Sequence, residues 1–583
     1  MQQTNFQQIG KRRVFAAIAL SIFHIHAMAQ TAGRVLDLRS GGSFEAMAES
    51  LVAGDTLIVH AGTYNDTGRL SIAARGTASA PIVIRGATGE ARPVITRPAT
   101  AALQNTINIE GAAYLTIKGL EIVGNGGDGI NLNSFPTFIT LEDLKIHDVD
   151  VGINFRSSMN NIVARRNEIY RTGARNGTGE GMYVGCNNAT CLVSDSLIEN
   201  NWIHDTLPGT TQGDGIEIKV GSHSNIIRDN VIYNRPYPGI FVYGTLANPA
   251  NLVEGNVIWN CLEGIYAVSD AIVRNNIILN STLGLSLYPH AQVPVLKNIT
   301  AVNNTLYGNG TGVQIRWGGT NMVLANNAIY SPGATAINGG GGISASAIVR
   351  NNYVEGASTV AIDNARFFNG GTSAATFTNP ITRNFWPTAA SILLGKADPT
   401  WSPTTDFNGS KRAAPFDVGA YQRDGLASNP GWAITTSFKT LPPPGTAPGE
   451  RILDNLGVGA RDTARGFTGV WCVSGAANKF GAHSLYSCGT GRDTYRWTPA
   501  ISTAGFYDVY VWWSTHANRS INVPISVKHA AGTSIKNYNQ RIGGGQWVLH
   551  GRYNLPSGNA SYVEVSDVNG QAAADAIKFF RVQ

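Results

Sequence analysis

The chain has 583 residues, 67 of them Gly, and only 14% of its residues are charged. This length exceeds one ordinary domain, unless that domain is a solenoid that grows by repetition. After the N-terminus no stretch of about 18 apolar residues occurs, so we expect no membrane span. The formal charge of +6 falls to +3 without the three basic residues of positions 1–29, so we expect no nucleic-acid partner.

The first 29 residues have the pattern of an export signal. Lys11, Arg12 and Arg13 form a basic start, residues 14–25 an apolar core, and residues 27–29 a small-x-small cleavage site. We therefore predict a signal peptide over residues 1–29 and a secreted or periplasmic protein.

A short amphipathic helix is predicted over residues 43–51, ahead of strand-like residues that run from Gly54 to Tyr64. A helix at this point would cover the open end of a β core, where exposed strand edges otherwise invite aggregation.

The centre of the chain repeats an Asn followed by apolar residues at intervals of roughly 20–30 residues. Short β-like runs without helical periodicity indicate a β solenoid. Asn tolerates left-handed turns and can hydrogen-bond to its equivalent in the next coil. An ordinary sandwich is the alternative, but sandwiches do not hold one register for so many turns. The repeated residues are Asn167, Asn201, Asn230, Asn256, Asn276, Asn304 and Asn327.

A second repeat is a Gly that opens a strand. Because side chains alternate along a strand, the first and third residues after the Gly point inward, and these are almost all apolar. The second and fourth residues point outward onto one parallel sheet face. The strand-opening residues are Gly129, Gly152, Gly181, Gly215, Gly239, Gly264, Gly284 and Gly312.

The opening segment and the coils after it resemble right-handed parallel β-helix proteins of the pectate lyase-like superfamily. The resemblance covers roughly residues 34–425, and we assign residues 30–425 to this domain. The superfamily includes polysaccharide lyases, polygalacturonase-like hydrolases and uronan epimerases. The resemblance therefore implies an extended polysaccharide as the partner, with a bias toward uronates.

Five cysteines fit an exported protein. Cys186 and Cys191 bracket a short loop, and Cys472 and Cys488 lie close together, so we expect two disulfides with Cys261 left alone. A metal site is the competing interpretation, but no paired Cys-x-x-Cys and no His at ligand spacing occurs.

A Pro/Gly-rich stretch at 441–449 belongs to a predicted linker over residues 426–449. Beyond it the repeat stops and alternating strands predict a small β-sandwich over residues 450–583. The segments at 467–471, 497–499, 543–547 and 574–579 are similar to the golvesin C-terminal-like module, which also accompanies xanthan lyases. The resemblance implies carbohydrate binding, with Trp513 and Trp547 either stacking on sugars or packed in the core.

The outward columns of the coils bring reactive residues together. Neighbouring coils lie about 4.8 Å apart, so Glu180, Asp214, Glu217, Lys219 and Tyr243 should converge near the middle of the helix. Aromatic residues on the same face offer stacking platforms beside these charges: Tyr183, Phe241, Tyr266 and Tyr288. A solvated charged surface is the alternative interpretation.

β-Elimination fits this cluster. Lys219, flanked by Glu217 and Asp214, is the candidate base if burial beneath substrate favours its neutral amine. Tyr243 would protonate the leaving oxygen. Arg156 and Arg316 would hold substrate carboxylates.

Calcium is the expected cofactor of this site, and we expect no organic cofactor. Glu180, Asp214 and Glu217 could bind Ca²⁺, which prefers several oxygen ligands. The strand with Glu217 followed by Lys219 resembles the corresponding strand of chondroitinase B-like and alginate lyase-like enzymes, although their full motif is not matched.

Two other functions stay open. A glycoside hydrolase would use Asp214 with Glu180 or Glu217 as its acid/base pair, but the Gly-Asp-Asp, Gly-His-Gly and Arg-Ile-Lys blocks of polygalacturonases are absent. An Asp-Pro-His-Asp motif is also absent, which disfavours an alginate-type epimerase. A non-catalytic glycan-binding or adhesive solenoid needs no reactive residues. The leading prediction is a monomeric lyase that cleaves an acidic exopolysaccharide.

Overall fold

The computed structural model describes residues 33–581, except for residues 99, 101–103, 317–318, 341, 441–449, 457–463, 477, 482, 490 and 502–503. The predicted signal peptide at 1–29 and the Pro/Gly-rich stretch at 441–449 lie outside the described residues. No helix of the described residues is both long and apolar enough to cross a membrane.

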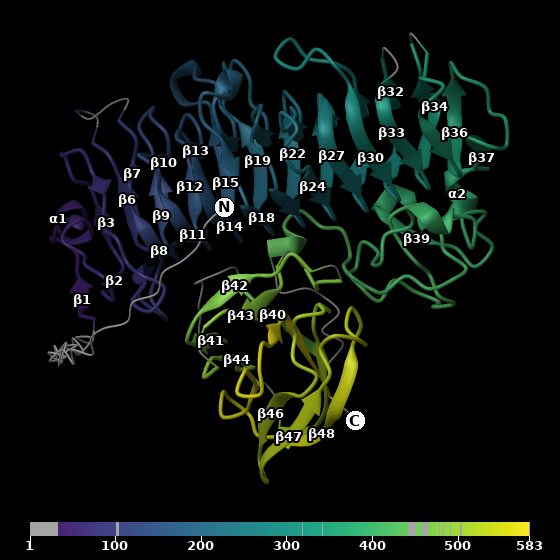
Figure 1. Cartoon of the computed structure of the whole chain (residues 1–583). Coiled ribbons are helices and arrows are strands. Elements are labelled where there is room, and N and C mark those ends of the chain that lie inside the picture. The colour runs from purple at the N-terminus through teal and green to yellow at the C-terminus, as the bar shows by residue number, and fades with distance from the viewer. Residues whose placement is uncertain are drawn as a thin grey trace, which may run out of the picture. The chain divides into compact units, whose positions relative to one another are not determined.

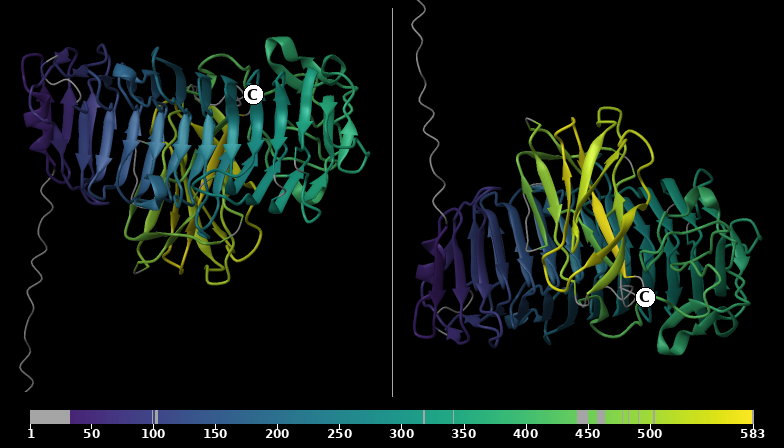
Figure 2. Two further views of the ribbon diagram at one scale, coloured as in Figure 1. Left: turned by 90° about the horizontal axis from the view of Figure 1, so that it is seen from above. Right: turned by 90° about the horizontal axis from the view of Figure 1, so that it is seen from below.

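The first part of the chain is a parallel β-helix in which each full coil gives one strand to each of three stacks (Figure 1). Figure 2 shows these strands side by side along the β-helix, from the purple N-terminal end to the green C-terminal end. The predicted solenoid is therefore confirmed. The first stack holds, in order, β1 (Val35–Leu38), β2 (Thr56–Val59), β5 (Ile82–Gly86), β8 (Ala113–Lys118), β11 (Thr137–Glu142), β14 (Met159–Arg165), β18 (Leu197–Glu199), β21 (Ile226–Arg228), β24 (Asn251–Glu254), β27 (Ser269–Arg274), β30 (Lys297–Val302), β33 (Thr320–Ala325) and β35 (Ile348–Arg350).

The other two stacks share the long strand β34 (Ala328–Asn338) and pair in the same parallel manner. The second stack holds β3 (Thr63–Tyr64), β6 (Val94–Thr96), β9 (Glu121–Val123), β12 (Lys145–His147), β15 (Glu168–Thr172), β19 (Trp202–Thr206), β22 (Val231–Arg235), β25 (Val257–Cys261), β28 (Ile277–Leu279), β31 (Thr305–Tyr307), then β34, β36 (Asn352–Ser358) and β37 (Phe367–Asn369). The third stack holds β4 (Ser71–Ile72), β7 (Ile107–Glu110), β10 (Ile130–Asn133), β13 (Ile153–Phe155), β16 (Met182–Val184), β20 (Ile216–Ile218), β23 (Ile240–Val242), β26 (Glu263–Ala267), β29 (Leu283–Leu287) and β32 (Thr311–Ile315).

The strand-opening glycines are required by the close approach of adjacent coils. A Cβ at Gly215 would lie 2.3 Å from the carbonyl oxygen of Gly239, and one at Gly181 would lie 2.5 Å from that of Gly215. The first and third residues after Gly215, Ile216 and Ile218, are fully buried in the β-helix core, as predicted.

The repeated Asn residues form a continuous buried ladder along the β-helix. Each side-chain amide donates to the Oδ1 of the next, at 2.9–3.0 Å, from Asn167 to Asn352. The predicted contact between equivalent residues is therefore confirmed. The left-handed residue is the one before each ladder Asn, for example Asn200 at φ 56° and Asp229 at φ 56°. The left-handed conformation that Asn tolerates is thus adopted by the residue before each ladder Asn, while the ladder Asn makes the predicted contact.

The predicted N-terminal helix is α1 (Phe44–Glu49). Ser43 caps it, since its hydroxyl accepts a hydrogen bond from the amide of Ala46 at 3.0 Å. Phe44 and Ala48 are buried at the end of the β-helix core, which confirms the predicted plug.

After β37 the chain turns back along the outside of the second stack. It passes through α2 (Ser373–Thr376) and the antiparallel pair β38 (Phe377–Asn379) and β39 (Asn384–Pro387). Residues 426–440, which the sequence assigned to the linker, pack on the β-helix: Trp432 and Phe438 are buried in one cluster with Trp259. The covering segment therefore extends to residue 440.

The C-terminal module is a β-sandwich of antiparallel sheets around its own core, as predicted. The Cys472–Cys488 disulfide links two of its strands' ends, and the predicted Cys186–Cys191 disulfide and free Cys261 are likewise confirmed. One sheet holds β40 (Glu450–Asp454), β51 (Ala576–Arg581), β45 (Gly505–Trp512) and β48 (Val548–Leu555); the second holds β41 (Arg465–Thr468), β44 (Thr494–Trp497), β49 (Tyr562–Ser566), β46 (Val523–His529) and β47 (Gly532–Tyr538); the third holds β42 (Trp471–Val473), β43 (Leu485–Ser487) and β50 (Ala573–Ala574).

The Asn ladder predicts the effect of removing one of its steps. Asn230→Ala removes the acceptor of the Asn201 amides and should destabilise the protein by about 1–3 kcal/mol for each buried group left unpaired. The measurement is chemical denaturation. Asn160→Ala, in an exposed strand position, should cost less than about 0.5 kcal/mol. Equal midpoints for both variants would contradict a stabilising ladder.

Candidate active site

The predicted cluster forms on the outer face of the third stack. Glu217 lies on β20, and Lys219 and Tyr243 follow β20 and β23 in register. The Lys219 Nζ donates to Glu217 Oε1 at 2.7 Å, and the Tyr243 hydroxyl donates to the same oxygen at 3.0 Å. Nζ and this hydroxyl lie 3.3 Å apart. One carboxylate oxygen therefore joins an amine and a phenol, which is a compact arrangement for proton transfer.

Lys219 is only 3% exposed, although it follows β20 on the outward face of the third stack. Its ammonium lies 4.4 Å from the centre of the Tyr243 ring and 5.0 Å from that of Tyr183. Two aromatic faces and one carboxylate thus replace water around this charge.

Two further acids stand beside Glu217. Glu180 and Asp214 each precede a strand-opening Gly, so consecutive coils present them at one level. One oxygen of each of the three carboxylates lies within 4.8 Å of the others. Glu180 Oε1, Asp214 Oδ1 and Glu217 Oε2 are buried, and none has a hydrogen-bond partner in the described structure. These open oxygens fit a hard cation such as Ca²⁺.

Burial raises the pKa of Glu180 and Asp214, two members of the acidic trio, by which we mean Glu180, Asp214 and Glu217. Burial raises the pKa of Glu180 to about 7, although the Thr178 hydroxyl donates to it at 2.6 Å. Burial and the neighbouring carboxylates of Glu217 and Glu180 raise the pKa of Asp214 well above its usual range. Burial and the negative charge of Glu217 also raise the pKa of the Tyr243 phenol, which keeps its proton at neutral pH.

The aromatic residues expected as sugar platforms stack on one another. The Phe241 ring centre lies 4.0 Å from that of Tyr243 and 4.3 Å from that of Tyr266, and Tyr266 continues to Tyr288 at 4.4 Å. Phe241, Tyr243 and Tyr266 are buried in one small cluster. Their broad faces are therefore occupied by neighbouring rings.

A loop over residues 288–295 covers this aromatic column. The His290 ring stands edge-on to Tyr243, with ring centres 4.8 Å apart, and the Tyr266 hydroxyl donates to the carbonyl of Pro289 at 3.0 Å. Burial and the positive charge of Lys219 lower the pKa of His290. This loop explains the burial that the outward columns alone did not predict.

The disulfide loop at 186–191 meets the covering loop beside Lys219. The amide of Asn188 donates to Gln292 Oε1 at 3.0 Å, and the Tyr183 hydroxyl donates to Asn187 Oδ1 at 3.0 Å. The Cys186–Cys191 disulfide holds this short loop closed. Together the two loops form one wall of the site.

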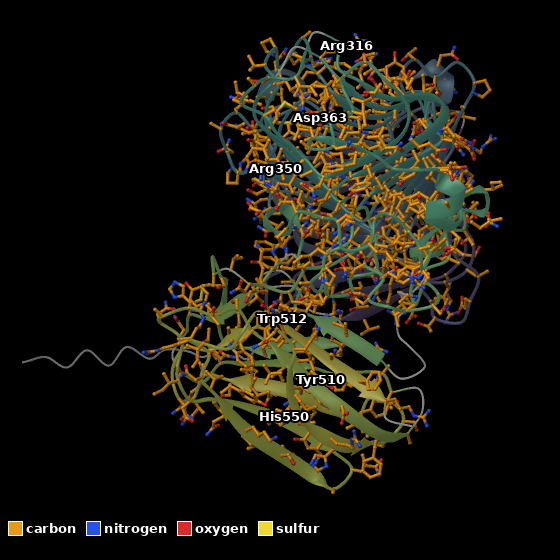
Figure 3. The ribbon with its side chains drawn as sticks, turned by 90° about the vertical axis from the view of Figure 1, so that its right-hand side faces the viewer. Arg316, Arg350, Asp363, Tyr510, Trp512 and His550 are labelled. Atoms are coloured by element: carbon orange, nitrogen blue, oxygen red, sulfur yellow. A yellow bond between two sulfur atoms is a disulfide. The ribbon has the colours of Figure 1, made fainter. Side chains whose placement is uncertain are left out.

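The two predicted substrate-binding arginines lie outside the central cluster. Arg156 is exposed on the coil before that of Tyr183. Arg316 is exposed at the rim of the β-helix, where Figure 3 labels it, with its guanidinium 5.3 Å from the centre of the Tyr288 ring. Among the described residues, neither arginine forms a hydrogen bond or an ion pair with Glu180, Asp214 or Glu217, and both arginines are accessible to solvent.

Sequence reasoning missed Arg235, a buried cation beneath the trio. It lies at the end of β22, and its guanidinium donates to the carbonyls of Gly179, Gly213 and Asp214. The outward columns come from the third stack alone, so they do not include a residue that reaches in from the second stack. The signal available in the sequence was a single Arg at a position where the neighbouring coils carry Thr or Cys.

The sandwich module carries its own aromatic cluster. Trp513, one of the two residues considered for sugar stacking, is 3% exposed and belongs to the core. The half-buried Trp547 contacts Trp512 and Phe480, with ring centres 5.4 and 5.1 Å away. Trp512 and Tyr510 lie along β45 (Figure 3).

Comparison with known proteins agrees with both parts of this architecture. Residues 100–250 and 245–329 match the family model for a right handed beta helix region, and residues 458–581 match that for the Golvesin C-terminal domain. Both matches agree with the fold described above, a right-handed β-helix that carries a golvesin-like domain, as the resemblance drawn from the sequence implied.

Individual relatives match either over a short part of this chain or at low sequence identity. A xanthan lyase of Bacillus sp. (strain GL1) is 35% identical over 144 residues, which are 23% of this chain and 16% of the relative. A solved Paenibacillus xanthan lyase is 32% identical over 23% of this chain and 13% of its own, with a TM-score of 0.22. Pectate lyase Pel9A is 16% identical over 68% of this chain and 97% of its own, with a TM-score of 0.43. The chain therefore spans less than a fifth of the curated relative.

The raised pKa of Glu180 predicts a pH-dependent stability. An acid whose pKa is raised by folding, here from 4.5 to about 7, binds its proton more tightly in the native state, so stability is lost as pH rises through this interval. Glu180→Gln mimics the protonated form. In chelator it should exceed wild type by up to about 3 kcal/mol at pH 8 and match it near pH 4. Denaturation at the two pH values tests this, and an equal difference at both would contradict it.

Proposed function

We propose that the protein is a polysaccharide lyase that cleaves an acidic, uronate-containing polysaccharide by β-elimination. The observation that carries the proposal is the triangle of Lys219, Glu217 and Tyr243 beside two further carboxylates on the outer face of the third stack. The 35% identity to a protein named xanthan lyase supports the reaction class.

Lys219 is the base of the proposed reaction. Its ammonium can pass a proton to Glu217 Oε1, 2.7 Å away, which leaves a neutral amine. The amine then removes the proton α to the uronate carboxylate, and the bond to the leaving oxygen breaks as the double bond forms. Tyr243, whose raised pKa retains the phenolic proton, donates it to that oxygen.

Ca²⁺ is the proposed cofactor, held by the open oxygens of Glu180, Asp214 and Glu217. Such an ion would neutralise charge on the substrate carboxylate and so ease removal of the neighbouring proton. Without such an ion the three carboxylates cannot all stay ionised at this spacing, and one of them would hold a proton instead.

Substrate contacts are assigned to the accessible residues of the same face. Arg156 and Arg316 would bind uronate carboxylates on either side of the cluster, because a guanidinium matches a carboxylate in geometry. Tyr183 and Tyr288 are half-buried and can still meet a sugar, whereas Phe241 and Tyr266 would support them from below. Two disulfides fit the proposed secreted or periplasmic location.

A glycoside hydrolase is the second candidate, favoured by one observation. Glu180, with a pKa of about 7, could hold the proton that a general acid needs. Carboxylate oxygens within 4.8 Å of one another suit a retaining mechanism rather than an inverting one. The lyase remains the first proposal because Lys219 and Tyr243 have defined roles only in elimination.

Substitutions at Lys219 and Glu217 should show that Lys219 is needed for activity even when the stability of the protein is restored. Lys219→Met should abolish product formation and destabilise the protein by about 3–5 kcal/mol, because it leaves Glu217 buried without its partner. Lys219→Met with Glu217→Gln should recover most of the stability and none of the activity. The measurement is ultraviolet absorbance of unsaturated product on a panel of acidic polysaccharides, beside thermal unfolding.

Lys297→Met, in the first stack, is the matched control and should keep wild-type turnover. A folded double variant that still forms unsaturated product would remove Lys219 from the mechanism.

Removal of calcium should reversibly stop the enzyme. After exhaustive chelation we expect activity to fall at least tenfold and to return with added Ca²⁺, while Glu180→Gln should weaken Ca²⁺ binding measured by calorimetry. Glu263→Gln is the control, because Glu263 is also buried before a strand Gly, three coils beyond Glu180. Full activity in chelator that is lost as pH rises through about 7, where Glu180 would give up the proton of a general acid, would favour the hydrolase.

The golvesin-like module is proposed to add affinity for polymer without taking part in the chemistry. A chain that ends at residue 440 keeps the covering segment and should retain kcat on short oligosaccharides, while KM on long polymer rises several-fold through lost avidity. Steady-state kinetics on both substrates would test this. Loss of oligosaccharide turnover in a folded truncation would place the module in the active site.

A further inference from the structure

Arg235 is a buried guanidinium for which the β-helix fold alone gives no reason. It is 2% exposed and lies in a column of small side chains: the register of the second stack places Cys261 on the following coil, and Thr172 pairs with Thr206 on the preceding ones. The coils that carry Thr172, Thr206 and Cys261 therefore form without a charged side chain at this position. Burying a guanidinium costs several kcal/mol unless its surroundings compensate, so this coil has a particular use for it.

The donors of Arg235 hold the turns that carry two of the three acids. Nη2 donates to the carbonyl of Gly179 at 2.6 Å and to that of Asp214 at 3.1 Å, and Nε donates to the carbonyl of Gly213 at 2.8 Å. Gly179 immediately precedes Glu180, and both Gly179 and Gly213 have left-handed backbones, φ 82° and 112°. One planar group thus links the two turns at their most flexible residues.

The same guanidinium is joined to the second stack. Nη1 donates to the carbonyl of Asp205 at 3.1 Å, and Nη2 also donates to the Thr172 hydroxyl at 3.0 Å. The Thr172 hydroxyl in turn donates to the carbonyl of Gly179 at 2.6 Å. The turn before Glu180 is therefore fixed from two sides.

Arg235 supplies positive charge beneath the trio without binding its carboxylates. Among the described residues, all acceptors of its hydrogen bonds are backbone carbonyls or the Thr172 hydroxyl. A direct ion pair would occupy the carboxylate oxygens that Glu180 and Asp214 leave open. Contact with the backbone gives the counter-charge and keeps those oxygens available.

We propose that Arg235 is the positioning residue of this site: it sets the spacing of Glu180 and Asp214 and leaves their carboxylates open to a cation or substrate. The inference rests on the proposed lyase function and deepens it. Lys cannot replace Arg here, because an ammonium has three donors on one atom and cannot span the four carbonyls that the planar guanidinium reaches.

The test compares Arg235→Lys with Arg412→Lys in the full chain. Arg412 is the matched control, since it is 3% exposed and its guanidinium likewise donates to backbone carbonyls, those of Asp417, Gly419, Ala420 and Tyr421. Both variants should lose thermal stability. Arg235→Lys alone should lower kcat by at least tenfold, with a smaller change in KM, because a displacement of the trio of about 1 Å is costly for catalysis.

Crystal structures of wild type and Arg235→Lys separate this proposal from the proposed function. If wild type releases no product from any acidic polysaccharide, the lyase fails, but displaced Glu180 and Asp214 carboxylates in Arg235→Lys would still support the positioning role. Superimposable carboxylates, or wild-type kcat in the folded variant, would overturn it. Should Arg235→Lys not fold, Thr172→Val removes one arm of the same support and should lower kcat several-fold. Unchanged kcat in that variant would equally overturn the proposal.

Discussion

Axial register between coils is the constraint on which the rest of the β-helix depends. Each coil must place its backbone directly over the one before it, because all strands of a stack hydrogen-bond to their neighbours in parallel. Strand-opening glycines allow the close approach, and buried asparagines fix the register, since each satisfies the backbone amide and side chain of the previous one. Side chains far apart in sequence thereby become neighbours in straight columns.

The candidate active-site cluster is a product of these columns. Glu180, Asp214 and Glu217 come together because consecutive coils repeat one local pattern, not because a loop folds to gather them. Concentrating negative charge in a buried place is unfavourable by itself. Lys219 compensates from above through a direct ion pair, and Arg235 from below through backbone carbonyls. The difference matters, since only the second kind of contact leaves carboxylate oxygens open.

What repeats in the sequence could be predicted, and what occurs once could not. The Asn and Gly periods predict the coils, and the outward columns that follow from these periods bring Lys219, Glu217 and Tyr243 together. The burial of Phe241 and Tyr266 was missed because it depends on residues 288–295, a loop that lies outside the repeated strands. Arg235 was missed because its partners lie 21–63 residues away and are mostly backbone atoms, which leave no mark in the sequence. Residues 426–440 resemble a linker in sequence because their apolar residues, Trp432 and Phe438, follow no period.

The central claim is that this buried cluster eliminates rather than hydrolyses, and the fate of water tests it most directly. Elimination takes no oxygen from solvent, whereas hydrolysis adds one solvent oxygen per cleaved bond, at the new reducing end. Cleavage of an acidic polysaccharide in water enriched in heavy oxygen, followed by mass spectrometry of the first products, distinguishes the two. The account predicts unlabelled reducing ends and new non-reducing ends that lack one water. Heavy oxygen incorporated at cleavage, with no unsaturated ends, would contradict it and transfer the chemistry from Lys219 to the carboxylates.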